Sequence, residues 1–405
     1  MNKCSCGNCD LEVFDDNSDK CIFHCEKDDS SNMNFWDEFN RYISTKNKES
    51  IKISNFIFPC VYKENFERLL NRNYSQISFY QCQFNNIDLN GMLFNSNILF
   101  QNCQFNNIDL TGTEFKYLEF NTITKAKEIY FSSMKVNGRF ELNNCTFDDN
   151  VYFDFSEFND NVVFTKTVFK ENINFHYTTF DKLAIFKNLN FEKNLNLEDT
   201  IFKDKTKFLK LEADVANRET ARIIKDSFEK QNNIIEANKF YALEMEKREK
   251  ELDFKKDFFE WFVFKIHGLS SNHSQDWTLA LFWIINLTFF YSYLNIQLND
   301  KILVFKIIFS CIAISVIACM TIKIPEENKE RRWLTTIPTT IVCYGFYGYL
   351  VETDWQLSEF SKNLNPFSIM RGDEPITLGT LIFKIIIAYL IYQLIISIRQ
   401  NTRRK

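Results

Sequence analysis

The middle of the chain carries a large apolar residue at every fifth position. The series begins at Phe79, runs through Phe84, Leu89 and Phe94, and resumes in the same phase at Phe100 after one inserted residue. A smaller residue, often Cys, Ile or Thr, lies two positions before most of these. Such a period matches neither the alternation of a half-buried strand nor the spacing of an amphipathic helix. It predicts a repeat structure in which like residues stack.

The repeat unit is visible directly in the letters of the sequence. QCQFNNIDLNG at 81–91 returns almost unchanged as NCQFNNIDLTG at 102–112. After a less regular stretch at 121–140, the spacing alternates between five and six, so an eleven-residue unit continues to Phe208. A unit of this size cannot bury its own apolar pair and must stack on its neighbours. The pattern therefore indicates a solenoid.

These residues resemble the pentapeptide-repeat family, whose pattern is A(D/N)LXX with a large apolar centre. The resemblance covers about 74–210. It implies a right-handed quadrilateral β-helix with four five-residue faces per coil and Phe or Leu stacked on the axis. We expect roughly six coils and a rod about 30 Å long, at ~4.8 Å between stacked strands. The phenylalanines then form a core and not an aromatic binding site.

The first 25 residues hold five of the twelve cysteines, in the pattern CxCxxC, eleven residues, CxxHC. Two short-spaced groups joined by a loop are what a tetrahedral zinc ion needs. The preferred ligands of a predicted structural zinc are Cys6, Cys9, Cys21 and Cys25. His24 in place of Cys25 is the alternative, and Cys4 is then a spare thiol. Unligated thiols and a catalytic or redox site are the competing interpretations.

Helical spacing replaces the five-residue period on both sides of the repeat. Phe35, Trp36, Phe39 and Ile43 form one helical stripe, which should dock the zinc segment onto the first coil. After the repeat, apolar spacing predicts helices at about 218–230 and 234–251, separated by Gln-Asn-Asn. The next segment, 253–268, concentrates aromatic residues between lysines, which is typical of a helix lying at a membrane surface. Packing of this segment onto the connector is the alternative.

Four apolar stretches close the sequence, at 277–294, 302–322, 333–350 and 376–398. Each is near the ~20 residues needed to cross a bilayer. Basic residues follow the second and the fourth stretch, which places those flanks in the cytoplasm. No signal-peptide pattern follows Met1. We therefore predict a multi-pass protein of the inner (cytoplasmic) membrane with both termini inside.

Two polar residues of the fourth stretch are candidates for a membrane lumen. Lys384 lies about eight residues into that stretch, or ~12 Å along a helix, where an ammonium group needs a polar cavity or a partner. Gln393 lies further along and could share the same lumen. Snorkelling of Lys384 to the surface, or a membrane boundary that lies later in the chain, is the alternative.

The expected fold class is therefore mixed: a quadrilateral β-helix, then a helical hairpin and a four-helix transmembrane domain. The expected domains are a zinc-knuckle segment at 1–30, a helical cap at 31–73, the β-helix at 74–210, the hairpin connector at 211–252, an interfacial helix at 253–275 and the membrane domain at 276–405.

Composition narrows the function. The chain has 44 Phe but only 9 Gly and 5 Pro, and it contains no P-loop, HExxH or GxSxG motif, so we expect no enzyme. The net charge of −5 argues against a nucleic-acid partner. Some soluble pentapeptide-repeat proteins protect topoisomerases by imitating DNA, but 14 basic against 17 acidic residues at 75–210 make a poor mimic.

Two hypotheses remain for the whole protein. In the first, a cytoplasmic interaction or sensor domain, with a protein partner on the β-helix surface, controls a channel-like or effector membrane domain that forms a homo-oligomer. In the second, the spans only anchor a non-enzymatic scaffold to the lipid bilayer. The loop between the third and fourth stretches has no TVGYG-like run of carbonyl groups, so potassium selectivity is not expected.

Overall fold

The chain forms two compact units, Met1–Asn232 and Asn233–Lys405. The structure is a computed structural model. It describes residues 4–5, 12–13, 19–26, 32–46, 49–71, 73–123, 126–294, 308, 329–350, 357–371 and 377–402. The boundary between the units falls inside the predicted connector, at the Gln-Asn-Asn break between its two helices.

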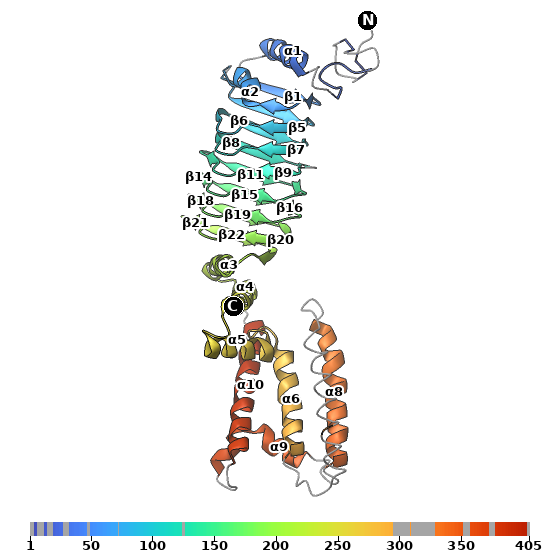
Figure 1. Ribbon diagram of the computed structural model, residues 1–405, viewed down its shortest axis with the longest axis vertical. Helices are drawn as coiled ribbons and strands as arrows, with labels where there is room; N and C mark the ends of the chain where they lie inside the picture. The colour runs from blue at the N-terminus through green and yellow to red at the C-terminus, as the bar shows by residue number, and fades with distance from the viewer. Residues whose placement is uncertain are drawn as a thin grey trace. The chain divides into compact units, whose positions relative to one another are not determined.

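The first unit contains a β-solenoid of about seven turns, stacked from blue to green in Figure 1. Its described strands form two parallel sheets, of twelve and eleven strands. The first sheet consists of β1 (Ser50–Ser54), β4 (Gln76–Tyr80), β6 (Leu93–Gln101), β8 (Glu114–Asn121), β10 (Lys135–Val136), β11 (Phe140–Asn143), β14 (Glu157–Phe158), β15 (Val162–Thr165), β18 (Thr179–Phe180), β19 (Ala184–Lys187), β21 (Ile201–Phe202) and β22 (Thr206–Leu209). The second consists of β2 (Ile57–Phe58), β3 (Val61–Tyr62), β5 (Gln83–Asp88), β7 (Gln104–Asp109), β9 (Glu128–Tyr130), β12 (Thr146–Phe147), β13 (Val151–Tyr152), β16 (Val168–Phe169), β17 (Ile173–Asn174), β20 (Asn190–Asn196) and β23 (Glu212–Val215).

Each coil is longer than four faces of five residues. Phe84 pairs with Phe105 in the early coils, whereas Phe164 pairs with Phe186 in the later ones, so the coil grows from 21 to 22 residues. The additional residues lie at sharp corners, where φ is positive every eleventh residue along the later coils. These corner residues include Ser133, Asn144, Phe155, Lys166, Tyr177, Asn188, Asp199 and Lys210. The eleven-residue unit is therefore two five-residue faces and one corner residue.

Phenylalanine rings fill the axis of the solenoid, as the repeat predicts. Phe169 is completely buried, and its ring centroid lies 5.4 Å from that of Phe147 and 5.3 Å from that of Phe191. Parallel rings at about this distance continue on both sides of the middle coil, where Val136 and Leu142 take axial positions. Neighbouring columns meet edge to face, for example Phe175 and Phe186 at 5.9 Å and 88°. Both arrangements are favourable for aromatic pairs.

At several corners the next residue is Ser or Thr, and its hydroxyl group bonds the backbone of a neighbouring coil. Ser156, Thr178 and Thr200 are buried, and their hydroxyl groups donate to backbone carbonyls of the preceding coil, each at 2.7 Å. A buried carbonyl left without a donor would cost free energy. A Ser or Thr two positions before a central residue therefore both fits the core and satisfies the backbone.

The solenoid begins earlier than the sequence predicts, inside the segment expected to be a helical cap. β1 pairs in parallel with β4, and Ile51 lies opposite Ile77. Two helices, α1 (Asn32–Ser44) and α2 (Lys63–Leu70), accompany these first strands. Because α2 interrupts the strands of the first turn, the apolar residues of that turn do not follow the five-residue spacing of the repeat. The solenoid therefore has about seven turns in place of the expected six. At ~4.8 Å per turn, its length is about 34 Å.

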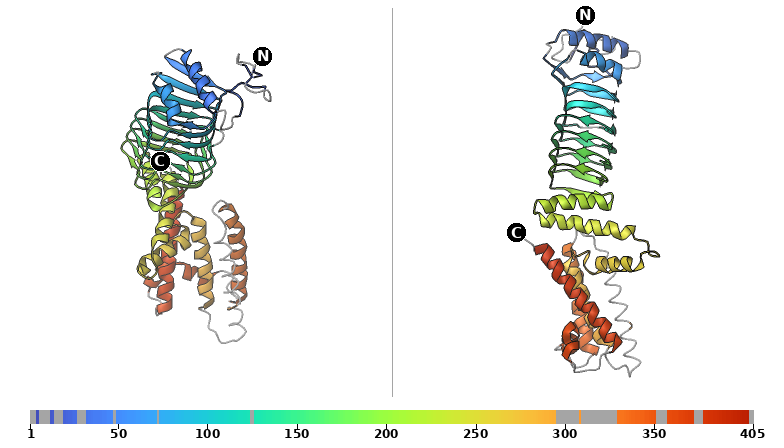
Figure 2. Two further views of the ribbon diagram at one scale, coloured as in Figure 1. Left: turned by 45° about the horizontal axis from the view of Figure 1, so that its top comes forward. Right: turned by 90° about the vertical axis from the view of Figure 1, so that its left-hand side faces the viewer.

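Helices cover both ends of the solenoid. The predicted stripe of α1 is confirmed, since Phe35 and Phe39 are buried and lie 5.4 and 5.6 Å from the ring of Phe58. At the other end, α3 (Arg218–Lys230) begins at Asn217, whose side chain accepts a hydrogen bond from the backbone of Thr220. Its buried face packs against β22 and β23 of the last coil. Figure 2 shows helices at the blue end and at the green end of the stack.

The second unit is helical. It contains α4 (Ile234–Glu251), α5 (Phe258–Ser271), α6 (Trp277–Leu294), α8 (Lys329–Leu350), α9 (Ser358–Leu364), the 3-10 helix η2 (Pro366–Arg371) and α10 (Leu378–Thr402). α6 packs against both α8 and α10 and lies between them in Figure 1. In the described part of the chain, one helical segment, Leu378–Gln400, is long and apolar enough to cross a membrane, and Trp277–Ser292 is a shorter apolar helix. The stretch at 302–322 lies outside the described residues except for position 308, so the four-span domain stays a prediction.

Replacing Phe169 by alanine should destabilise the solenoid by ~3–5 kcal/mol, because the stacked coils cannot close the cavity that a buried aromatic ring leaves. Thr165→Ala, on a half-buried position of the same coil, is the control and should change little. Chemical denaturation followed by circular dichroism measures both. Equal losses at the two positions would contradict the assignment of Phe169 to the axis.

Candidate functional site

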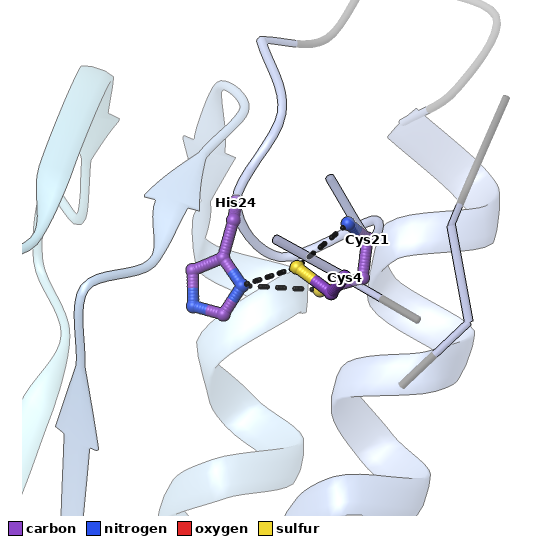
Figure 3. A group of neighbouring side chains, drawn as sticks. All are labelled: Cys4, Cys21 and His24. Carbon is purple, nitrogen blue, oxygen red and sulfur yellow. Dashed lines mark hydrogen bonds between the residues drawn. The ribbon is translucent and has the colours of Figure 1, made fainter. Parts of the chain in front are cut away.

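Two cysteines and a histidine meet near the N-terminus. The Nδ1 atom of His24 lies 3.1 Å from the Sγ atom of Cys21 and 3.6 Å from that of Cys4. Figure 3 shows the three side chains turned toward one another. All three are buried, and their ligand atoms lie within 4.8 Å of each other. The group could hold a metal ion.

The spacing fits a tetrahedral ion. With Zn–S bonds of about 2.3 Å and Zn–N bonds of about 2.0 Å, a tetrahedron has S···N edges near 3.5 Å and S···S edges near 3.8 Å. The two measured S···N distances, 3.1 and 3.6 Å, bracket the first value. Thiolate sulfur and imidazole nitrogen are also the donors that structural zinc sites use.

A single tight turn supplies two of the three donors. The backbone N–H groups of His24 and Cys25 both donate to the carbonyl of Cys21, at 2.9 and 3.1 Å, which brings the side chains of Cys21 and His24 to one side. Cys4 comes from a distant segment, and its sulfur accepts a hydrogen bond from the backbone N–H of Cys21 at 3.2 Å. The turn is held in place because Phe23 stacks on Phe56 at 4.3 Å.

The cluster differs from the preferred ligand set. His24, the alternative ligand, lies in it together with Cys21, whereas the sulfur of Cys25 lies 3.9 Å from the carbonyl of Ile22 and is not part of the group. Cys4, expected to be a spare thiol, is a member. Cys6 and Cys9 lie outside the described residues. Spacing along the chain could not show that Cys4 folds back onto the second pair.

Lys384 lies deep in an apolar helix and therefore needs a polar partner. Backbone carbonyl groups provide it. Its Nζ atom donates to the carbonyls of Lys362, Asn363 and Asn365 at 2.7, 2.9 and 2.9 Å. These three contacts use every N–H of the ammonium group. They satisfy carbonyls at the end of α9, where a helix leaves its last acceptors without partners. Lys384 thus joins α10 to α9.

Gln393 takes part in a different contact on the same helix. Its Oε1 atom accepts hydrogen bonds from the hydroxyl groups of Ser271 and Ser274, at 3.0 and 3.1 Å. Ser274 also contacts Nε2 of His267 at 3.0 Å, and burial lowers the pKa of this histidine. Nine residues of helix, about 14 Å, separate Gln393 from Lys384, so the two residues do not form one site.

Comparison with known families supports the repeat. Residues 142–190 match the family model described as pentapeptide repeats (9 copies). Together with the β-solenoid, the match supports a pentapeptide-repeat protein. Comparisons with curated proteins and with solved structures gave no significant match.

Replacing Lys384 by methionine should lower the thermal unfolding midpoint of the second unit in detergent, because the buried carbonyl of Asn363 loses this donor, and a buried carbonyl without a donor costs about 1–3 kcal/mol. Lys362→Met changes an exposed lysine of α9 and should have little effect. If Lys384→Met were as stable as the natural chain, Lys384 would not be the residue that holds α9.

Proposed function

We propose that the protein is a non-enzymatic interaction scaffold attached to a membrane. The observation that carries this proposal is the closed interior of the solenoid. Stacked phenylalanines occupy its axis, so its outward faces are what it can offer to another molecule. A pentapeptide-repeat domain is consistent with a protein-interaction role. The channel-like alternative is less favoured, because Lys384 and Gln393 are engaged in separate packing contacts.

Exposed apolar side chains on the helices support attachment to a membrane. On α10, Ile385, Tyr392 and Ile395 are 60%, 59% and 58% exposed. On α5, the predicted interfacial helix, Phe259 and Val263 are 83% and 61% exposed. Contiguous apolar surface of this kind is costly in water and favourable against lipid. The basic flanks of the sequence favour a cytoplasmic location for the solenoid.

We also propose that the cysteine–histidine cluster binds one structural zinc. Cys4, Cys21 and His24 would supply three ligands, and Cys6 and Cys9 are the candidates from the sequence for the fourth. Complete burial of Cys21 argues for a closed structural site, since a catalytic zinc keeps an open position for substrate.

Purified protein should contain about one zinc per chain, and Cys21→Ser should lose most of it because structural zinc needs all of its ligands. Elemental analysis measures the metal, and loss of zinc should also lower the thermal midpoint. Cys60→Ser, in the same unit but outside the cluster, is the matched control. Zinc-free natural protein, prepared under reducing conditions without chelator, would contradict the site.

The membrane role predicts that the full chain stays with membranes after an alkaline carbonate wash. Ile385→Arg should release a larger fraction, because an arginine at the bilayer centre costs about 2.5–3.5 kcal/mol on insertion scales. Ile201→Arg, at a residue of the solenoid that is 53% exposed, should not. The measurement is the bound fraction on an immunoblot.

The interaction role is tested on the same membranes with a photo-crosslinking residue at outward positions of the solenoid. Discrete adducts with another protein are expected. Release of the natural chain by the wash would contradict the anchor, and crosslinking that yields no adduct from any face would contradict the scaffold.

A further inference from the structure

A ladder of exposed aromatic rings lies along one corner of the solenoid. Phe155 and Tyr177 are 58% and 51% exposed, and their rings stack at 5.3 Å. On the adjoining face Tyr130 is 41% exposed and stacks on Tyr152 at 5.8 Å. His176 directly precedes Tyr177, and its ring lies 4.3 Å from that of Tyr177 and 6.1 Å from that of Phe155. We name these five residues the aromatic ladder.

The two corner residues of the ladder are not there for the fold. Phe155 and Tyr177 have φ of +59° and +53°, a conformation that bulky residues rarely adopt. The same corner is occupied by Gly112, Ser133 and Asp199 in other coils. Small or polar residues therefore satisfy this corner, and the aromatic rings gain little burial in return.

Negative charge surrounds the ladder. The four stacked segments 128–135, 150–157, 172–179 and 194–201 lie in register and contain one basic residue, Lys135. Their carboxylates, none of which is buried, are Glu128, Asp154, Glu157, Glu198 and Asp199. The carboxylate of Asp199 lies 3.7 Å from Nε2 of His176 and accepts a hydrogen bond from Tyr177, which raises the pKa of that phenol. Lys135 lies opposite Glu157 on the neighbouring coil, 3.9 Å from its carboxylate, so this one lysine is paired.

We propose that the aromatic ladder binds an extended, arginine-rich segment of a partner protein. This inference rests on the proposed scaffold function and names the surface and the chemistry of its partner. Guanidinium groups stack on aromatic rings and bind carboxylates through two parallel hydrogen bonds, so they match both features of the surface. Lysine offers a point charge and should bind more weakly.

The dimensions suit a short extended peptide. Four stacked segments span three intervals of ~4.8 Å, or about 14 Å, which is the length of four to five residues of extended chain. Alternate side chains of such a chain point to one side. Two or three arginines could therefore face the ladder at once.

The test measures binding of a fluorescein-labelled peptide of alternating arginine and glycine to the full chain in detergent, by fluorescence anisotropy. The double variant Phe155→Asn/Tyr177→Asn should bind about tenfold more weakly, since two cation–π contacts are lost. Asparagine tolerates positive φ, so the variant should keep the thermal midpoint of the natural protein. Leu209→Asn, at another exposed apolar residue of the solenoid, is the matched control and should bind normally.

Further arms separate the explanations. A lysine–glycine peptide should bind more weakly than the arginine peptide, and added salt should weaken both. Equal binding of the arginine peptide by the natural chain and the double variant would overturn the proposal. A change of oligomeric state as the only difference between the double variant and the natural chain would overturn it as well. If the natural chain does not bind the peptide but both proteins form the same crosslinked adducts in cells, the aromatic ladder is not the site while the scaffold function stands.

Discussion

The stacking of phenylalanine rings from coil to coil is the interaction on which the first unit depends. Each coil is too small to bury its own apolar residues, and the parallel strands leave backbone groups that only the next coil can pair. Rings about 5 Å apart, such as Phe180 and Phe202 at 4.9 Å, lie along the axis. Because these rings occupy the axis, the outward faces are the part of the solenoid that another molecule can reach.

The corner residue lets that surface vary. At each corner the chain needs one residue with positive φ whose side chain points away from the axis. Asparagine, lysine, phenylalanine and tyrosine all occupy such positions here. The core thus constrains the residues that flank the corner and leaves the corner itself open to selection for binding. This separation explains how the aromatic rings of Phe155 and Tyr177 can lie on the surface of the solenoid without disturbing the stacked phenylalanines of its core.

The sequence was sufficient wherever apolar periodicity determines structure. The stacked phenylalanines, the stripe of α1 and the helices at 218–230 and 234–251 were predicted because each follows from local spacing. The first turn was missed because α2 interrupts its strands. The place of Cys4 in the cysteine–histidine cluster and the carbonyl partners of Lys384 were missed for another reason. Both depend on a distant segment that folds back, and the spacing of residues along the chain does not show which segments fold back onto each other.

A stacked repeat needs protection at its ends, since the last coil exposes both its rings and its unpaired strand edges. At one end α3 covers Phe208, whose ring lies 6.3 Å from that of Phe228. At the other end Phe35 and Phe23 extend the aromatic core beyond the first coil, and the turn that carries Phe23 is the turn that presents Cys21 and His24. The segment around this turn is too short to build a core of its own. A metal bound there would fix the turn, and with it Phe23, over the open end of the stack, so the cluster is best understood as part of the cap that closes the solenoid.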